Sequence, residues 1–198
     1  MKDGFLPHID SYWGKYRIPT NRYQKWNYAS DGLYFITICT ANRIDWFGEI
    51  HDAKMQLSEI GTIAEKYLKE IPEHFPNAYI DTFVIMPDHI HVIINIIPYE
   101  YMTQSVETRD SRVSTEMRKT KPTLRPLSIS SMINQFKSVC TKHIRNSGHD
   151  DFAWQPRFHD RLIRKKEEYK KIRQYIEENP SQWGEKSKKE SAYGFLFS

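Results

Sequence analysis

The sequence predicts an α+β fold in which helices pack against an antiparallel sheet. Two segments rich in β-branched and aromatic residues, 79–86 and 89–97, are separated only by Pro87-Asp88 and therefore predict a β-hairpin. Apolar residues recur at helical spacing over 128–146, which predicts an amphipathic helix. Strands and helices that interleave around hairpins in this way are typical of one sheet covered by helices.

The first half of the chain supplies an arm, a strand and a helix before the hairpin. Residues 1–28 are rich in Tyr, Arg, Lys and Trp without a clean period, so we expect an irregular N-terminal arm. Residues 33–40 (LYFITICT) predict a strand. Residues 57–71 place apolar side chains at helical spacing, and Pro72 is expected to end that helix.

The second half begins with a polar stretch, 98–127, which we interpret as an insertion loop. After the helix at 128–146, residues 157–164 alternate weakly and predict a last strand. A strongly charged helix is expected over 165–178, closed by Asn179-Pro180, with 184–198 as a C-terminal tail. We therefore expect one domain over 1–198.

The composition favours a folded protein outside the membrane. The chain is 39% hydrophobic and 14% aromatic, which is too apolar for general disorder. Its two cysteines are too few for a disulfide scaffold, and its start lacks the apolar run of a signal peptide. The longest apolar stretch is interrupted by polar residues, so no membrane span is predicted. We expect a cytoplasmic protein.

Positive charge is concentrated in one part of the chain. Residues 137–173 contain 11 Lys/Arg and 5 Asp/Glu, a net charge of +6, whereas the whole chain carries +4. Such a segment predicts a surface for phosphate backbones, although a solvated helix face explains the charge equally well. The candidate DNA contacts are Lys137, Lys142, Arg145, Arg157, Arg161, Arg164 and Lys165.

The histidine pair His89-Ile90-His91 is the sharpest chemical feature. Residues two apart in a strand point to the same side, so both imidazoles share one face and can bind one divalent ion. Asp88 could add an oxygen ligand or simply form the turn. From this motif alone, two half-buried structural histidines are the more frequent explanation.

Tyr175 and Asn179 are four residues apart and share one face of the predicted helix. A phenol can act as a nucleophile on a phosphodiester if a cation or base assists it, and Asn179 could add an amide oxygen to a metal held by the histidines. Taken alone, an ordinary tyrosine and a common Asn-Pro helix ending are the more frequent explanation.

Several motifs in order resemble the HUH single-tyrosine transposases, specifically the REP-associated tyrosine transposases. The resemblance covers about 28–183. It consists of YFITICTANR as a first strand, FGEI with MQLSEIG before the first helix, FVIMPDHIHVII as the histidine hairpin, SMINQFKSVCTKHI as the long helix, WQPRFHDRLIR as the last strand and IRQYIEENPSQW as the nucleophile helix.

The resemblance implies a ferredoxin-like HUH nuclease fold, metal ligands at His89 and His91, a nucleophile at Tyr175 and a metal-assisting amide at Asn179. It also implies cleavage and joining of single-stranded or hairpin DNA through a 5′-phosphotyrosine, with Mg²⁺ or Mn²⁺ suited to phosphate oxygens. Related enzymes include dimers and monomers, so a homodimer stays open. The alternative is a domesticated, non-catalytic DNA hairpin-binding protein. A histidine-metal hydrolase of small molecules has little support.

Two positions depart from the family pattern. The family usually has Asn at the position of Asp88, and aromatic residues are common at the position of His159. His159 and Asp160 suggest an acid–base pair, but neighbours in a strand point to opposite faces, so we do not expect them to act together.

Overall fold

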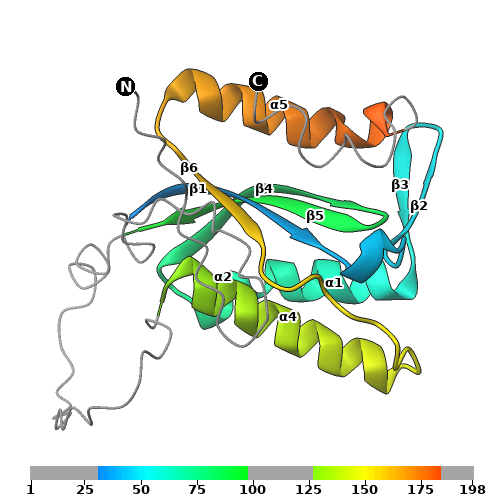
Figure 1. The fold of residues 1–198 in the computed structure, drawn as a ribbon. Helices are drawn as coiled ribbons and strands as arrows, with labels where there is room; N and C mark the ends of the chain where they lie inside the picture. Colours follow the sequence, from blue (N-terminus) through cyan, green and yellow to red (C-terminus); the bar gives the residue numbers. More distant parts are fainter. Residues whose placement is uncertain (1–30, 98–126, 184–198) are drawn as a thin grey trace, which may run out of the picture.

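The computed structural model describes residues 31–97 and 127–183, and the fold of this part is drawn in Figure 1. The predicted arm, insertion and tail lie outside the described residues, except for Leu127. Within the described part, four antiparallel strands form a sheet in the order β4-β5-β1-β6. These strands are β1 (Gly32–Cys39), β4 (Ala78–Met86), β5 (His89–Ile96) and β6 (His159–Ile163).

Helices cover both faces of this sheet (Figure 1). The helices α1 and α4 lie on one face, and α5 crosses the other. The predicted α+β architecture of an antiparallel sheet with helices packed against it is therefore confirmed. The helices are α1 (Glu59–Lys69), α2 (Ile71–His74), α4 (Ile129–Asn146) and α5 (Lys166–Gln182).

Strand β5 supplies side chains to both layers, because its alternate residues point to opposite faces. Ile90, Val92 and Ile94 belong to the larger core, which also contains buried side chains of α1 and α4. Ile93 belongs to a second cluster with Ile172 of α5. The same alternation directs His89 and His91 toward the α5 layer.

The hairpin of β2 (Gly48–His51) and β3 (Lys54–Leu57) was not predicted, because its strands are short and largely polar. Gly48 has a φ of 134°, and a Cβ there would lie 2.0 Å from the Gln56 carbonyl oxygen. The glycine of the FGEI motif is thus required by the close approach of the two strands. Ser58 follows the hairpin and caps α1 by accepting a hydrogen bond from the Gly61 N–H at 3.0 Å.

Two predicted helix ends are wrong. Helix α1 stops at Lys69, and Pro72 lies in the first turn of α2, where a missing N–H costs nothing. Helix α5 continues through Asn179-Pro180 to Gln182. Pro180 has no N–H to donate to the carbonyl four residues earlier, so the helix loses one hydrogen bond there and ends two residues later. No helix in the described ranges is long and apolar enough to cross a bilayer.

Candidate active site

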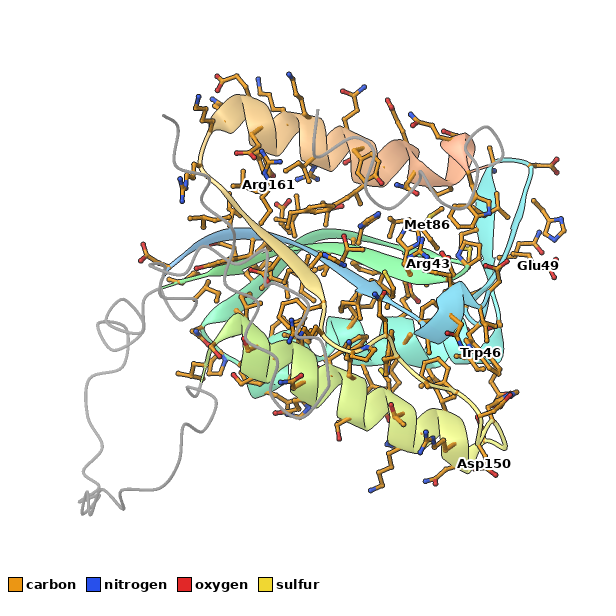
Figure 2. All side chains as sticks on the ribbon, viewed as in Figure 1. Arg43, Trp46, Glu49, Met86, Asp150 and Arg161 are labelled. Atoms are coloured by element: carbon orange, nitrogen blue, oxygen red, sulfur yellow. The ribbon has the colours of Figure 1, made fainter. Side chains whose placement is uncertain are left out.

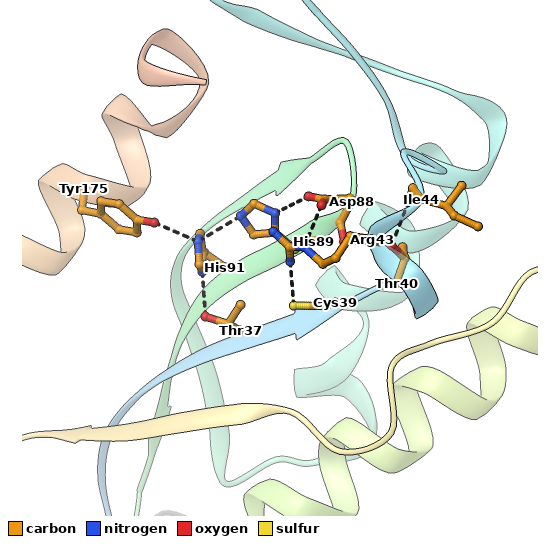
Figure 3. A network of polar contacts seen from close by, with 9 residues as sticks. All are labelled: Thr37, Cys39, Thr40, Arg43, Ile44, Asp88, His89, His91 and Tyr175. Carbon is orange, nitrogen blue, oxygen red and sulfur yellow. Dashed lines mark hydrogen bonds and ion pairs between the residues drawn. The ribbon is translucent and has the colours of Figure 1, made fainter. Parts of the chain in front are cut away.

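The two predicted metal-binding histidines lie side by side at the start of β5. His89 and His91 are both fully buried, and their Nε2 atoms are 3.1 Å apart (Figure 3). The ring centroids are 4.5 Å apart, with the rings nearly perpendicular. The shared strand face inferred from their spacing therefore brings the two Nε2 atoms together.

Each outer ring nitrogen has a polar partner that fixes the ring. The Asp88 carboxylate lies 2.7 Å from Nδ1 of His89, and the Thr37 hydroxyl lies 2.8 Å from Nδ1 of His91. An ionised carboxylate only accepts hydrogen bonds, so Nδ1 of His89 carries the proton and Nε2 presents a lone pair. The Thr37 hydroxyl can donate or accept a hydrogen bond, so Nδ1 of His91 can be either protonated or unprotonated. Such partners orient histidine ligands in metal sites.

The environment keeps both imidazoles neutral. Burial lowers the pKa of His89 well below 6.5, and the Arg43 charge adds to this effect. Burial also lowers the pKa of His91 well below that value, with further contributions from His89 and Arg43. Neutral imidazole is the form that binds a metal ion.

This geometry fits a divalent cation. An octahedral ion such as Mg²⁺ has ligands at about 2.1 Å, so two adjacent ligand atoms lie about 3.0 Å apart. The 3.1 Å between the Nε2 atoms matches that spacing. Within 31–97 and 127–183, no group of three His, Cys, Asp or Glu side chains is arranged to hold a metal. The remaining ligands would come from an amide such as Asn179, from water or from phosphate.

Tyr175 of α5 reaches the histidine pair from the layer above the sheet. Its phenol oxygen lies 3.2 Å from Nε2 of His91, and the two ring centroids are 5.3 Å apart. Asn179 is buried and its side chain hydrogen-bonds the phenol. Burial raises the pKa of Tyr175, and the Asn179 hydrogen bond and the Arg43 charge offset part of that rise. The phenol is therefore protonated at neutral pH and needs help to react.

Helix α5 is held on the sheet by apolar and polar contacts. Ile172 and Ile176 pack on Phe35 and Ile93 in the smaller core cluster. At the β-bulge of β4, Asp81 accepts hydrogen bonds from the Tyr169 hydroxyl at 3.0 Å and from Arg173 at 3.3 Å. These contacts on both sides of the helix fix the position of Tyr175.

Two residues near the site were missed by the sequence analysis. Nε of Arg43 lies 2.8 Å from Oδ2 of Asp88, and its Nη1 donates to Sγ of Cys39 at 2.9 Å. The Trp183 ring packs on His89 with centroids 5.8 Å apart. Arg43 had no signal in the sequence, because the burial of Asp88, which makes a nearby cation necessary, is seen only in the structure. Trp183 had none beyond its place in the helix motif.

The register of β6 separates His159 from Asp160, as the sequence analysis expected. His159 pairs with Thr37, whereas Asp160 pairs with Ile36, so the two side chains point to opposite faces. Burial lowers the pKa of His159. This histidine shares the site face but is two strands away from His91.

The candidate DNA contacts divide between two layers of the molecule. Lys142 and Arg145 are exposed on α4, on the face opposite α5. Arg157, Arg161, Arg164 and Lys165 are exposed around β6 and the start of α5, and Figure 2 shows Arg161 on the α5 side.

Lys137 has a different environment from the other candidate contacts. It donates to the carbonyl oxygens of Gln155 and Arg157. Burial lowers the pKa of Lys137 to about 8. Its ammonium group thus ties α4 to the segment before β6.

The free energy of unfolding of the metal-free protein should fall as the pH drops below about 6.5. His89 and His91 have folded-state pKa values well below 6.5, so below this pH the unfolded chain takes up protons that the folded chain does not. Their contribution to stability is present above pH 6.5 and is lost on acidification. Urea unfolding in EDTA between pH 7.5 and 5 measures this slope, and replacing both histidines by Ala should flatten it. Equal slopes would contradict the prediction.

The chain is similar to known proteins in both sequence and fold. Residues 30–127 match the family described as IS200-like transposases. An uncharacterized protein of Haemophilus influenzae is 35% identical over 162 residues, which cover 82% of this chain and 87% of that protein. The structure of a REP-associated tyrosine transposase bound to a REP hairpin aligns with a TM-score of 0.53 and 21% identity, over 83% of this chain and 75% of that one. That structural match shows a shared fold.

Proposed function

Because this chain belongs to the IS200-like transposase family, it is a transposase that acts on DNA, and we propose that it cleaves and rejoins single strands with Tyr175 as the nucleophile. One observation carries the proposal. The phenol of Tyr175 lies 3.2 Å from an imidazole that comes from a segment 84 residues earlier, and that imidazole is paired with a second one. A phenol beside two neutral imidazoles whose Nε2 atoms face each other is the arrangement that metal-assisted attack on a phosphate needs.

In the proposed reaction, the Tyr175 oxygen attacks a backbone phosphorus of single-stranded DNA. A bond forms between that oxygen and phosphorus, and the bond from phosphorus to the 3′ oxygen breaks. The phenol loses its proton, and the leaving 3′ oxygen gains one. The products are a 5′-phosphotyrosine and a free 3′-hydroxyl. Attack of a 3′-hydroxyl on the phosphotyrosine reverses these changes and joins strands without hydrolysis.

His89 and His91 would hold Mg²⁺ or Mn²⁺ through their Nε2 atoms, with the Asn179 amide as a further oxygen ligand. A divalent ion held there would polarise a phosphoryl oxygen and neutralise developing charge. Asn179 already hydrogen-bonds the phenol, so it keeps Tyr175 oriented. Because the Tyr175 and Trp183 rings pack against the buried histidines, access of a phosphate to the Nε2 atoms requires a shift of these rings.

We propose hairpin DNA as the substrate. The structural relative named above is bound to a REP hairpin, and the exposed cations around β6 and α5 lie in the same layer as Tyr175. The test is incubation with labelled hairpin oligonucleotides and Mg²⁺ or Mn²⁺, followed by denaturing electrophoresis. A covalent protein–DNA adduct that EDTA prevents is expected. Metal-independent binding without an adduct across a panel of hairpins would instead favour a non-catalytic hairpin-binding protein.

Removing charge near α5 should weaken DNA binding more than removing it from α4. Replacing both Arg164 and Lys165 by Gln should reduce the slope of log affinity against log salt by about 1.4, at about 0.7 per phosphate contact for single strands. Replacing Lys142 and Arg145 by Gln removes the same charge from the opposite layer, so a smaller change is expected. Fluorescence anisotropy at several salt concentrations measures both. Equal slopes for the two double variants would show that the cations near α5 contribute no more to DNA binding than those on α4.

A further inference from the structure

We propose that Arg43 is a positioning residue that acts on the metal site through Asp88. It holds the Asp88 carboxylate, and that carboxylate holds His89 with Nε2 directed toward His91 (Figure 3). The inference rests on the proposed metal-binding role of the two histidines. It assigns a role to a residue outside the histidine hairpin and the nucleophile helix.

The turn that carries Arg43 is strained and is tied to the turn that carries Asp88. Asn42 and Arg43 have φ values of 54° and 56°, which residues other than glycine rarely adopt. The Thr40 N–H donates to the Asp88 carbonyl at 3.0 Å, and the Thr40 hydroxyl donates to the same oxygen. Beyond Arg43, the Phe47 N–H donates to the Pro87 carbonyl at 2.9 Å. The two turns are thus fixed together on both sides of Arg43, and this fixes its backbone within reach of Asp88.

Asp88 needs a cation at this place. Its side chain is fully buried, and a buried carboxylate without a counter-charge is strongly unfavourable. Oδ1 lies next to Nδ1 of His89, and Oδ2 lies next to Nε of Arg43. The carboxylate is therefore held by a hydrogen bond at Oδ1 and by an ion pair at Oδ2. An asparagine side chain could also accept a hydrogen bond from Nδ1 of His89, and being neutral it would need no cation. The aspartate at position 88 is accommodated because Arg43 supplies the counter-charge.

The contacts of Arg43 favour an indirect role over a phosphate contact. Nε is engaged by Asp88 and Nη1 by Cys39, and the side chain is 25% exposed. Nη2 is buried and has no hydrogen-bond partner among the described residues. Two of its three nitrogens thus point at protein groups and the third is closed to solvent. The guanidinium is placed to support Asp88.

A double-mutant cycle on the full chain tests this inference, with Mn²⁺ affinity measured by electron paramagnetic resonance in the absence of DNA. Arg43→Gln should weaken Mn²⁺ binding by about 10-fold, the lower end of the effect of losing a direct partner of a metal ligand, because Arg43 acts through Asp88. In an Asp88→Asn background, which removes the carboxylate, the same substitution should change the affinity by less than about twofold. Lys66→Gln, an exposed cation on α1, is the charge-matched control.

Unchanged Mn²⁺ affinity in Arg43→Gln would overturn the inference, and so would an equal loss in both backgrounds, because that would show a role independent of Asp88. If Arg43→Gln does not fold, Arg43→Lys serves instead. It keeps the charge but cannot span Asp88 and Cys39 together, so a smaller loss that disappears with Asp88→Asn is expected. Wild-type protein that binds no Mn²⁺ would overturn the metal proposal and this inference together. Wild-type binding that His91→Ala removes would leave the metal proposal standing whatever Arg43 does.

Discussion

Replacing Tyr175 by Phe is expected to abolish the covalent adduct with a single-stranded hairpin oligonucleotide. The variant removes only the phenol oxygen that lies 3.2 Å from Nε2 of His91, while the ring can keep its packing on Phe35 and His91. Loss of a nucleophile typically lowers the rate by several orders of magnitude, on the order of 10⁴-fold or more. Denaturing electrophoresis after incubation with Mn²⁺ measures the adduct.

The same variant should keep its other properties. Hairpin affinity and Mn²⁺ affinity should both stay within about threefold of the wild-type values, because the phenol oxygen is neither a predicted phosphate contact nor a metal ligand. Tyr79→Phe is the matched control, since Tyr79 is 58% exposed on β4 and its adduct yield should equal that of the wild type. Undiminished adduct formation by Tyr175→Phe would end the assignment of Tyr175 as nucleophile.

The histidine pair could be predicted from the sequence because a strand has a fixed period. Once 89–97 is read as a strand, residues 89 and 91 must share a face. The alternation also predicts which side chains enter the larger core, and Ile90, Val92 and Ile94 are found there. The contact of Tyr175 with His91 could not be predicted in this way. It depends on where α5 crosses the sheet, and Tyr175 lies 84 residues after His91 in the chain. For that, only the resemblance to a family provided an expectation.

The contacts behind the site depend on turn geometry, which short-range patterns do not encode. Arg43 contacts Asp88 from a turn in which Asn42 and Arg43 adopt positive φ angles. No property of the ANR sequence requires those angles. The end of α5 could not be predicted from local sequence either. Helix propensity predicts an end at Asn179-Pro180, but Asn179 is buried against the rest of the protein and the helix continues to Gln182. The charge pattern likewise could not place Lys137, whose ammonium is engaged by backbone carbonyls.

Replacing His91 by Ala should remove both metal binding and adduct formation. His91 supplies one of the two Nε2 atoms that match the ligand spacing of a divalent ion, and one remaining imidazole cannot hold the ion in place. Loss of the electrostatic assistance of a metal costs several kcal/mol in the transition state, so the adduct rate should fall on the order of 10³-fold. Mn²⁺ affinity and adduct yield are measured on the same preparation, with His51→Ala of the exposed β2–β3 hairpin as the control.

Comparing Tyr175→Phe with His91→Ala distinguishes the nucleophile from the metal ligand, which a measurement of activity alone cannot do. Tyr175→Phe should bind Mn²⁺ without forming an adduct, whereas His91→Ala should do neither, although both remove a group from one 3.2 Å contact. If His91→Ala kept its Mn²⁺ affinity but lost the adduct, the ion would bind elsewhere and the imidazole would act on the phenol directly, as a base. If it lost Mn²⁺ but still formed the adduct at the wild-type rate, Tyr175 would attack without metal assistance. Either result would break the proposed link between the two segments, because that link requires the ion and the nucleophile to meet at His91.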